Sequence, residues 1–179
     1  MALTNKTTPS FFSGEEKAFG KDFKHWIKEY WKSFLYDDEK RSKGKVYMLP
    51  TNLEMHPQSE TDFTIEQKKA ILLPVGKWIS VVPATEFKAK AIAMKNMAIE
   101  RLDAYQDLNV YVDGELVSDQ CFRHMSDYFD IDYKWMAICD AYWLFIKPYS
   151  FEKGEHKINT FVSCSSGQTQ ISLYYRLMV

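Results

Sequence analysis

Hydrophobic and polar residues alternate through most of the C-terminal half of the chain, in short runs separated by turn residues. Residues 108–112 form one run, and Asp113 and Gly114 close it. An Asp-Gly pair is typical of the tight turn between two antiparallel strands. Further runs cover residues 141–146, 156–162 and 168–177. This rhythm predicts a mainly β fold, an antiparallel β-sandwich of jelly-roll type.

Shorter extended runs lie upstream and between these strands. They cover residues 46–49, 61–65, 70–75, 78–82 and 128–133. The run at 141–146 differs from the others because it is apolar at every position. A strand without a polar face is expected in the middle of a sheet that is covered on both sides.

Two segments have a helical period instead. Ser13, followed three residues later by Glu16, has the form of a capping box and predicts a helix from there to about Asp37. The apolar positions of this helix are Phe19, Phe23, Trp26, Ile27, Tyr30 and Phe34, and the opposite face carries Lys17, Lys21, Lys24, Lys28 and Lys32. A second helix, at 86–104, is rich in good helix formers and is expected as an insertion between strands.

These elements suit one domain with an appendage. Residues 1–12 are expected to form a flexible tail, 13–44 an N-terminal amphipathic helix and a charged loop, and 45–179 the β-sandwich domain. Hydrophobic residues make up 46% of the chain and aromatic residues 16%, which is enough for a substantial core.

Charge and hydropathy exclude some partners. The net charge of −1 gives no overall attraction to nucleic acid, and no apolar run reaches the roughly 20 residues of a transmembrane helix. The first ten residues lack the apolar core of a signal peptide, which favours the cytoplasm as written, or export if a leader has been removed.

The chain has an odd number of cysteines, Cys121, Cys139 and Cys164, and none of them has CxxC spacing. Free thiols are therefore expected, with one disulfide possible in an exported protein.

A segment near the C-terminus resembles the closing motif of a protein family. It reads D-A-Y-W-L-F-I-K-P-Y-S over residues 140–150 and G-E-H-K-I over 154–158, against a family pattern of roughly D-G-Y-W-x-x-x-K-P-L-S-P-G-x-H-x-I. Residues 69–75 and 108–114 are similar to two further segments of this uncharacterised family of bacterial and archaeal β-sandwich proteins. The resemblance covers roughly residues 45–179, with Ala141 in place of the motif glycine. It implies a β domain and possible export, and it assigns no activity.

The candidate metal and catalytic residues are few. The histidines show no HxH or HExxH spacing, which disfavours a cupin-like metal site. Asp127, Asp130 and Asp132 form an acidic cluster, and the last two share one face of a strand. The cluster suits a solvated strand face, a calcium site, or, with His156, the cleft of a hydrolase.

Several aromatic residues are candidates for ligand binding. Tyr111, Tyr128, Tyr149 and Tyr174 fall at polar-face or loop positions, where they either stack on a sugar or are ordinary half-buried side chains. His156 is a further binding candidate. Because it points toward the apolar side of its strand, it is expected to donate to a backbone carbonyl or a tyrosine hydroxyl.

The row of five lysines either is a solvated outer face or meets an anionic surface or an acidic partner. Together these features favour a non-catalytic binding or interaction module for a glycan or a protein. No cofactor is expected apart from the possible calcium ion. The alternatives are a hydrolase, or a self-associating structural protein with the first helix as its docking element.

Overall fold

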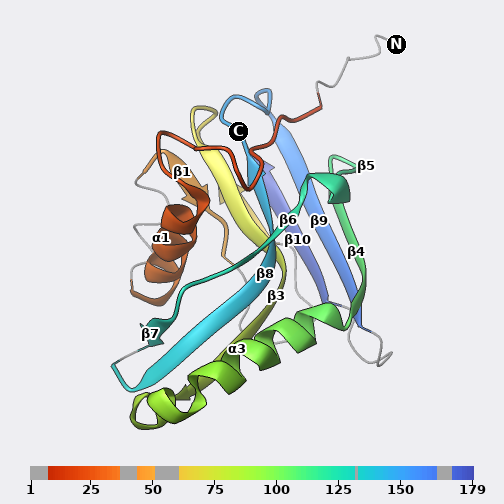
Figure 1. Cartoon of the computed structure of the whole chain (residues 1–179). Coiled ribbons are helices and arrows are strands. Elements are labelled where there is room, and N and C mark those ends of the chain that lie inside the picture. The colour runs from red at the N-terminus through yellow and green to blue at the C-terminus, as the bar shows by residue number, and fades with distance from the viewer. Residues whose placement is uncertain (1–7, 37–43, 51–60, 132, 165–170) are drawn as a thin grey trace, which may run out of the picture.

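A computed structural model describes residues 8–36, 44–50, 61–131, 133–164 and 171–179, and it contains two five-stranded sheets and two helices (Figure 1). The helices are α1 (Phe23–Tyr36) and α3 (Phe87–Asp103), and two short 3-10 turns are η1 (Ala84–Glu86) and η2 (Ser118–Gln120). The strands are β1 (Val46–Met48), β2 (Thr61–Thr64), β3 (Ala70–Pro83), β4 (Tyr105–Val112), β5 (Glu115–Leu116), β6 (Phe122–Met125), β7 (Phe129–Ile131), β8 (Trp135–Ile146), β9 (Glu155–Cys164) and β10 (Ile171–Met178).

Both sheets are mixed. The first sheet has the order β1-β3-β8-β6, with β7 also paired to β8, and the second has the order β2-β10-β9-β4-β5. β1 runs parallel to β3, and β2 runs parallel to β10. The predominance of strands and the inserted second helix are therefore confirmed. The expectation of purely antiparallel sheets is wrong, and the jelly-roll strand order is not confirmed.

β8 is the central strand of the first sheet. β3 pairs with it along one edge, and three segments follow one another along the other edge: the chain around Phe11, then β6, then β7. The Phe12 amide donates to the Phe145 carbonyl at 2.8 Å, and the two phenyl rings lie 4.7 Å apart. The expectation of a flexible tail is therefore wrong for residues 8–12, because Phe12 belongs to the core. The rest of that tail lies outside the described residues.

Alternation along β8 divides the core into separate clusters. Ala141, Trp143 and Phe145 pack with the residues of α1. Leu144 and Ile146 point the other way, into the core that the two sheets share. The same face of β8 extends beyond the second sheet. There α3 covers it by packing on Ile138. The layers are thus α1, the first sheet, and the second sheet with α3 beside it (Figure 1).

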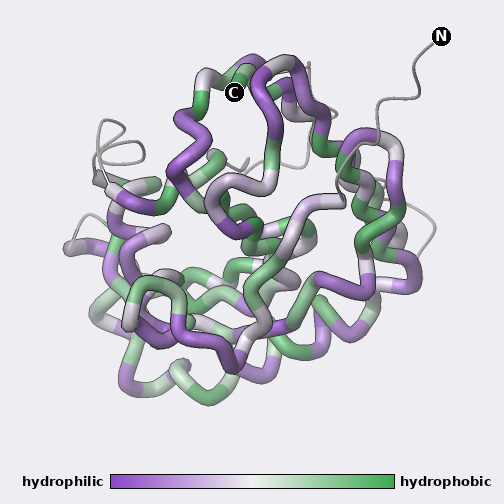
Figure 2. The backbone as a smooth tube through the Cα atoms, turned by 90° about the horizontal axis from the view of Figure 1, so that it is seen from above, coloured by the Kyte–Doolittle hydropathy of each residue, from purple (hydrophilic) through white to green (hydrophobic). Residues whose placement is uncertain are grey.

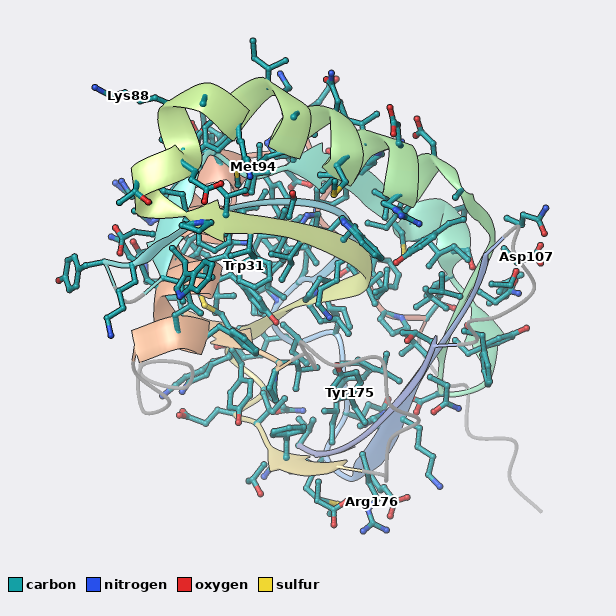
Figure 3. All side chains as sticks on the ribbon, turned by 90° about the horizontal axis from the view of Figure 1, so that it is seen from below. Trp31, Lys88, Met94, Asp107, Tyr175 and Arg176 are labelled. Atoms are coloured by element: carbon teal, nitrogen blue, oxygen red, sulfur yellow. The ribbon has the colours of Figure 1, made fainter. Side chains whose placement is uncertain are left out.

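Two further views show where hydrophobic and charged residues lie relative to the strands. Seen from above, hydrophobic stretches of chain run through the middle of the molecule (Figure 2). From below, Met94 lies on the side of α3 that faces the strands, and Lys88 points away from them (Figure 3). Only one side of α3 is therefore used in packing, since Met94, Ala98 and Leu102 are its buried residues.

The two sheets approach each other closely at Gly76. A β-bulge shifts the pairing of β3 with β8 between Pro74 and Gly76. A Cβ atom at Gly76 would lie 3.2 Å from the Tyr105 ring and 3.3 Å from Val162, which is tighter than ordinary contacts. The glycine therefore lets the second sheet pack against β3, a known use of glycine inside a strand.

α1 begins ten residues later than the sequence predicted. Phe19 and Gly20 have positive φ angles of 53° and 78°, which break the helical path. The helix is capped by Asp22, whose Oδ1 accepts the His25 amide hydrogen at 2.9 Å. Ser13 instead belongs to a turn, in which its carbonyl accepts the Glu16 amide hydrogen. The prediction that Ser13 and Glu16 cap this helix is therefore wrong. The left-handed backbone at Phe19 and Gly20 separates them from α1, because a right-handed helix cannot continue through such residues.

A network of ion pairs, in which only Asp140 is buried, ties the edge of the first sheet to α3. Arg123 of β6 donates to Asp140 Oδ2 from Nε at 2.9 Å and from Nη2 at 2.5 Å. Its Nη1 donates to Asp103 of α3. The Asp140 side chain is 3% exposed, so its charge depends on Arg123 for compensation.

The two candidate caps of α1 can be separated by mutation. Asp22→Ala should lower the free energy of unfolding by about 1 kcal/mol, because one N-terminal amide loses its acceptor. Ser13→Ala is the matched control and should change it by less than about 0.5 kcal/mol. Urea unfolding monitored by circular dichroism measures both. A larger loss for Ser13→Ala than for Asp22→Ala would contradict the observed helix start.

Removing Arg123 should be costly. Arg123→Met leaves the Asp140 carboxylate buried without its cation, and the expected loss is about 3 kcal/mol of unfolding free energy. Arg176→Met is the control, since Arg176 pairs with the exposed Asp62 and should cost less than about 1 kcal/mol. Equal losses for the two variants in chemical denaturation would argue against the assigned role of Arg123.

Candidate binding groove

A groove of about 620 Å³ lies between α1 and the chain that runs from the end of β6 past β7. One wall is α1, and the other comprises residues 125–130 and Tyr133. A volume of this size is within the range of ligand sites, about 300–1,000 Å³. Trp31 of α1 lines the groove, and Figure 3 places it on the opposite side of the strands from α3.

The floor of the groove is aromatic. Trp31 of α1 stacks on Phe129 of β7, with ring centroids 5.2 Å apart and an angle of 10° between the planes. Ile27 and Met48 extend this apolar floor. Trp31 is only 2% exposed, and its indole Nε1–H has no hydrogen-bond acceptor among the described residues. A buried donor left without an acceptor is costly, so this atom marks a place where an acceptor would stabilise the structure.

The wall formed by β6 and β7 is held in place by hydrogen bonds. Ser126 pairs with Cys139 of β8 in both directions: its amide donates to the Cys139 carbonyl at 2.8 Å, and its hydroxyl oxygen accepts the Cys139 amide hydrogen at 2.9 Å. The Tyr128 hydroxyl donates to the Ala91 carbonyl of α3 at 2.8 Å. Beyond β7, Tyr133 has a positive φ of 56° and is 89% exposed at the rim.

The helical wall contains part of the lysine row. Lys24, Lys28 and Lys32 line the groove. Lys32 pairs with Glu29 at 3.1 Å, whereas Lys24 and Lys28 make no ion pair with any residue that the structure describes. Lys17 and Lys21 lie before the first residue of α1 and are exposed. The prediction of five lysines on one helical face is therefore wrong, because α1 starts at Phe23.

The acidic cluster is only partly in view. Asp127 and Asp130 both line the groove and are exposed, while Asp132 lies outside the described residues. In the described part of the chain, no three histidine, cysteine, aspartate or glutamate side chains are close enough to hold a metal ion. The calcium site thus stays a prediction. The sequence indicated the lysines and the carboxylates as two separate candidate groups. The fold places Lys24, Lys28 and Lys32 on one wall of the groove and Asp127 and Asp130 on the facing wall.

The candidate tyrosines do not share one platform. Tyr128 lines the groove, whereas Tyr111 lies on β4 of the second sheet, against Phe161. Tyr149 lies in the loop after β8, where its backbone amide donates to the Gln67 carbonyl. The side chain of Tyr174 is outside the described residues.

His156 is a structural residue of the second sheet. Its Nδ1 lies 2.6 Å from Asp113 Oδ2, and its Nε2 lies 2.9 Å from the Glu152 carbonyl oxygen. The carbonyl contact is the one that the sequence predicted. Asp113 itself has a φ of 53° in the tight turn between β4 and β5, and its Oδ1 accepts the Lys157 amide hydrogen. His156 therefore links this turn to β9 and does not line the groove.

The described thiols carry no reactive signature. Cys121 and Cys139 are free, as expected. Burial raises the pKa of Cys121 to about 12. Both thiols are therefore protonated near neutral pH and poor nucleophiles. The side chain of Cys164 lies outside the described residues.

The sequence analysis did not predict the residues that form the floor of the groove as functional residues. Trp31 was absent from the predicted apolar stripe, although its spacing of four residues from Ile27 would have placed the two on one face. Phe129 was assigned to a strand, but nothing local indicated that its ring would meet an α1 side chain about 100 positions earlier. Ser126 gave no signal, because its role depends entirely on the backbone of β8.

Comparisons with protein-family models, curated proteins and solved structures each found no match for this chain. In the described residues, no helix is long and apolar enough to cross a membrane. The resemblance to the uncharacterised β-sandwich family is therefore still a prediction.

His124, which precedes the groove wall on β6, should make stability sensitive to acid. Burial, with a smaller contribution from Lys24, lowers the pKa of His124 below its usual 6.5. Its ring packs edge-on against Phe23 at 5.5 Å. Because the folded state holds the proton less tightly than the unfolded chain, the stabilisation is present above pH 6.5 and is lost as pH falls through the lowered pKa.

The expected result is that the wild-type free energy of unfolding falls between about pH 7.5 and pH 5, and that His124→Gln reduces this fall. Urea titrations of both proteins at the two pH values measure the difference. An identical pH dependence in the two proteins would show that another group causes it.

Proposed function

We propose that this protein is a non-catalytic binding module that holds its ligand in the groove between α1 and β7. The observation that carries the proposal is a concave site of about 620 Å³ whose floor is a stacked aromatic pair, with a buried indole N–H that has no acceptor among the residues that the structure describes. An apolar floor with a few polar groups directed at it is the usual composition of a ligand site.

The chemistry of the groove supports binding better than hydrolysis. A hydrolase would combine Asp130 or Asp132 with His156, but His156 is engaged with Asp113 and Glu152 on the second sheet. Both ring nitrogens already face acceptors there, so the ring lacks a free position for a substrate. The groove carboxylates Asp127 and Asp130 therefore do not have His156 as a catalytic partner.

The surroundings of the groove favour a protein over a glycan. The face of the first sheet that α1 covers continues beyond the helix, where Val81 is 43% and Trp135 is 45% exposed. Tyr133 adds a third exposed apolar side chain at the rim. Aromatic residues around an apolar centre, bordered by charges of both signs, are typical of protein interfaces.

The finer features of the fold are proposals of the same kind. A β-sandwich of jelly-roll type and membership of the uncharacterised β-sandwich family are proposed from the strand rhythm and from the motif of residues 140–158. A calcium ion at Asp127, Asp130 and Asp132 would require the last of these to join the groove wall.

The proposal can be tested by NMR mapping with the ¹⁵N-labelled full chain. The probes are a library of small aromatic fragments, a set of oligosaccharides and a pool of random peptides. Shifts that concentrate on residues 24–32 and 126–130 are the expected result, because these segments form the two walls.

A groove-filling variant provides the control for this experiment. Asp127→Trp adds bulk at an exposed position of the groove wall and should remove the shifts, while Ser118→Ala, which lies outside the groove lining, should leave them unchanged. Binding that maps to the outer face of the second sheet, or persists in Asp127→Trp when that variant is folded, would overturn the assignment.

A further inference from the structure

We infer that the groove binds a segment of a partner protein in which an apolar side chain is flanked by acidic residues. This inference rests on the proposed function, because it names the ligand of the same groove. Three features of the groove support it: the hydrogen-bond donors near the floor, the charges of the walls and the apolar side chains of the floor.

The first observation is the excess of donors at the floor. The Trp31 Nε1–H is buried and has no acceptor among the described residues. The Ser126 oxygen already accepts the Cys139 amide hydrogen, which leaves its own O–H free to donate. Both side chains are buried, so an acceptor on the ligand, such as a backbone carbonyl or a carboxylate, reaches these donors only when the atoms that cover them move aside.

The second observation is the imbalance of unpaired charge on the two walls. Lys24 and Lys28 lie one helical turn apart on α1 and have no ion-pair partner in the described part of the chain. Asp130 on the opposite wall already has an interaction partner, which leaves Asp127 as the facing carboxylate. Before the helix, the exposed Lys17 and Lys21 are offset by acidic neighbours that are equally exposed, namely Glu15, Glu16 and Asp22. The unpaired positive charge is therefore confined to Lys24 and Lys28, and acidic side chains complement these two lysines.

The third observation is the apolar floor, which fits an anchor side chain. Ile27, Met48 and the Trp31–Phe129 stack form a surface that a leucine or aromatic side chain can bury. Interfaces of this kind derive most of their affinity from one such anchor in a pocket. The acidic residues then lie along α1, where their spacing would match lysines that are four residues apart.

The test uses a phage-displayed library of random peptides of about 12 residues, selected against the full-length protein. The expected result is enrichment of peptides that carry Asp or Glu on both sides of a leucine or an aromatic residue. Enriched sequences that are basic or uncharged, or the absence of any enrichment, would overturn the inference.

The selected peptide is then measured against two charge-reversal variants of equal net charge. Lys24→Glu/Lys28→Glu should weaken binding at least about tenfold, and Lys95→Glu/Lys153→Glu, with both changes on exposed residues outside the groove, should leave it within about twofold. Affinity of the wild-type protein should also fall as sodium chloride is raised from about 50 to 500 mM. Equal effects of the two double variants would contradict a role for α1.

The donor at the floor is tested without changing the shape of the side chain. Replacing Trp31 by β-(3-benzothienyl)alanine keeps a bicyclic ring and removes the N–H. The expected loss is about fivefold in affinity with little change in melting temperature. Unchanged affinity in this folded variant would remove Trp31 as a donor to the ligand.

Failure of this inference is distinguishable from failure of the proposed function. Fragments or oligosaccharides that map to the groove by NMR, together with no enrichment of acidic peptides, would leave a binding groove but reject its protein ligand. Loss of both signals would reject the groove itself.

Discussion

Burial of β8 on both faces is the constraint on which the rest of the structure depends. Its last six residues, from Ala141 to Ile146, are apolar, and all but Tyr142 are buried. Full burial of a side chain such as Phe145 contributes about 1.5–3 kcal/mol, but only if a layer covers that face. The strand therefore requires α1 on one side and the second sheet with α3 on the other. The N-terminal segment, β6 and β7 complete its second edge and satisfy its backbone.

The groove forms where α1 stops covering the first sheet. α1 packs on the face that Trp143 and Phe145 present, through a cluster of aromatic contacts with Phe23, Trp26 and Tyr30. β3 and β8 continue beyond the helix, as the long strands of Figure 1 show. Between the helix and the broken edge strand, the Trp31–Phe129 contact closes the floor but the walls stay apart. The edge is broken because residues 126–128 leave the strand geometry between β6 and β7.

Ion pairs and hydrogen bonds hold this edge in place. Arg123, Asp140 and Asp103 join β6, β8 and α3 in one ion-pair network. Ser126 and Tyr128 add hydrogen bonds from the next residues to β8 and α3. The groove wall is thus positioned from behind, while its front carries Asp127 and Asp130 toward α1. Preorganisation of this kind lowers the entropic cost of binding.

The sequence by itself determined the local elements. The period-two pattern located most of the strands, but it divided β3 into two and missed β6 and the first half of β8. The Asp113-Gly114 pair predicted the turn, with positive φ at both residues, and the apolar run at 141–146 predicted the central strand. The inserted helix was also placed closely, at 86–104 against Phe87–Asp103. These features depend on backbone preferences and on burial of one face or both, which neighbouring residues report directly.

Only the tertiary structure decided which elements meet. The parallel pairs β1–β3 and β2–β10 and the use of residues 8–12 as edge backbone depend on contacts between distant segments. The groove has the same origin, since Trp31 and Phe129 are joined by packing and not by spacing. A sequence pattern reports the environment that a side chain needs, but not which distant side chain supplies it, because many pairings bury the same apolar area.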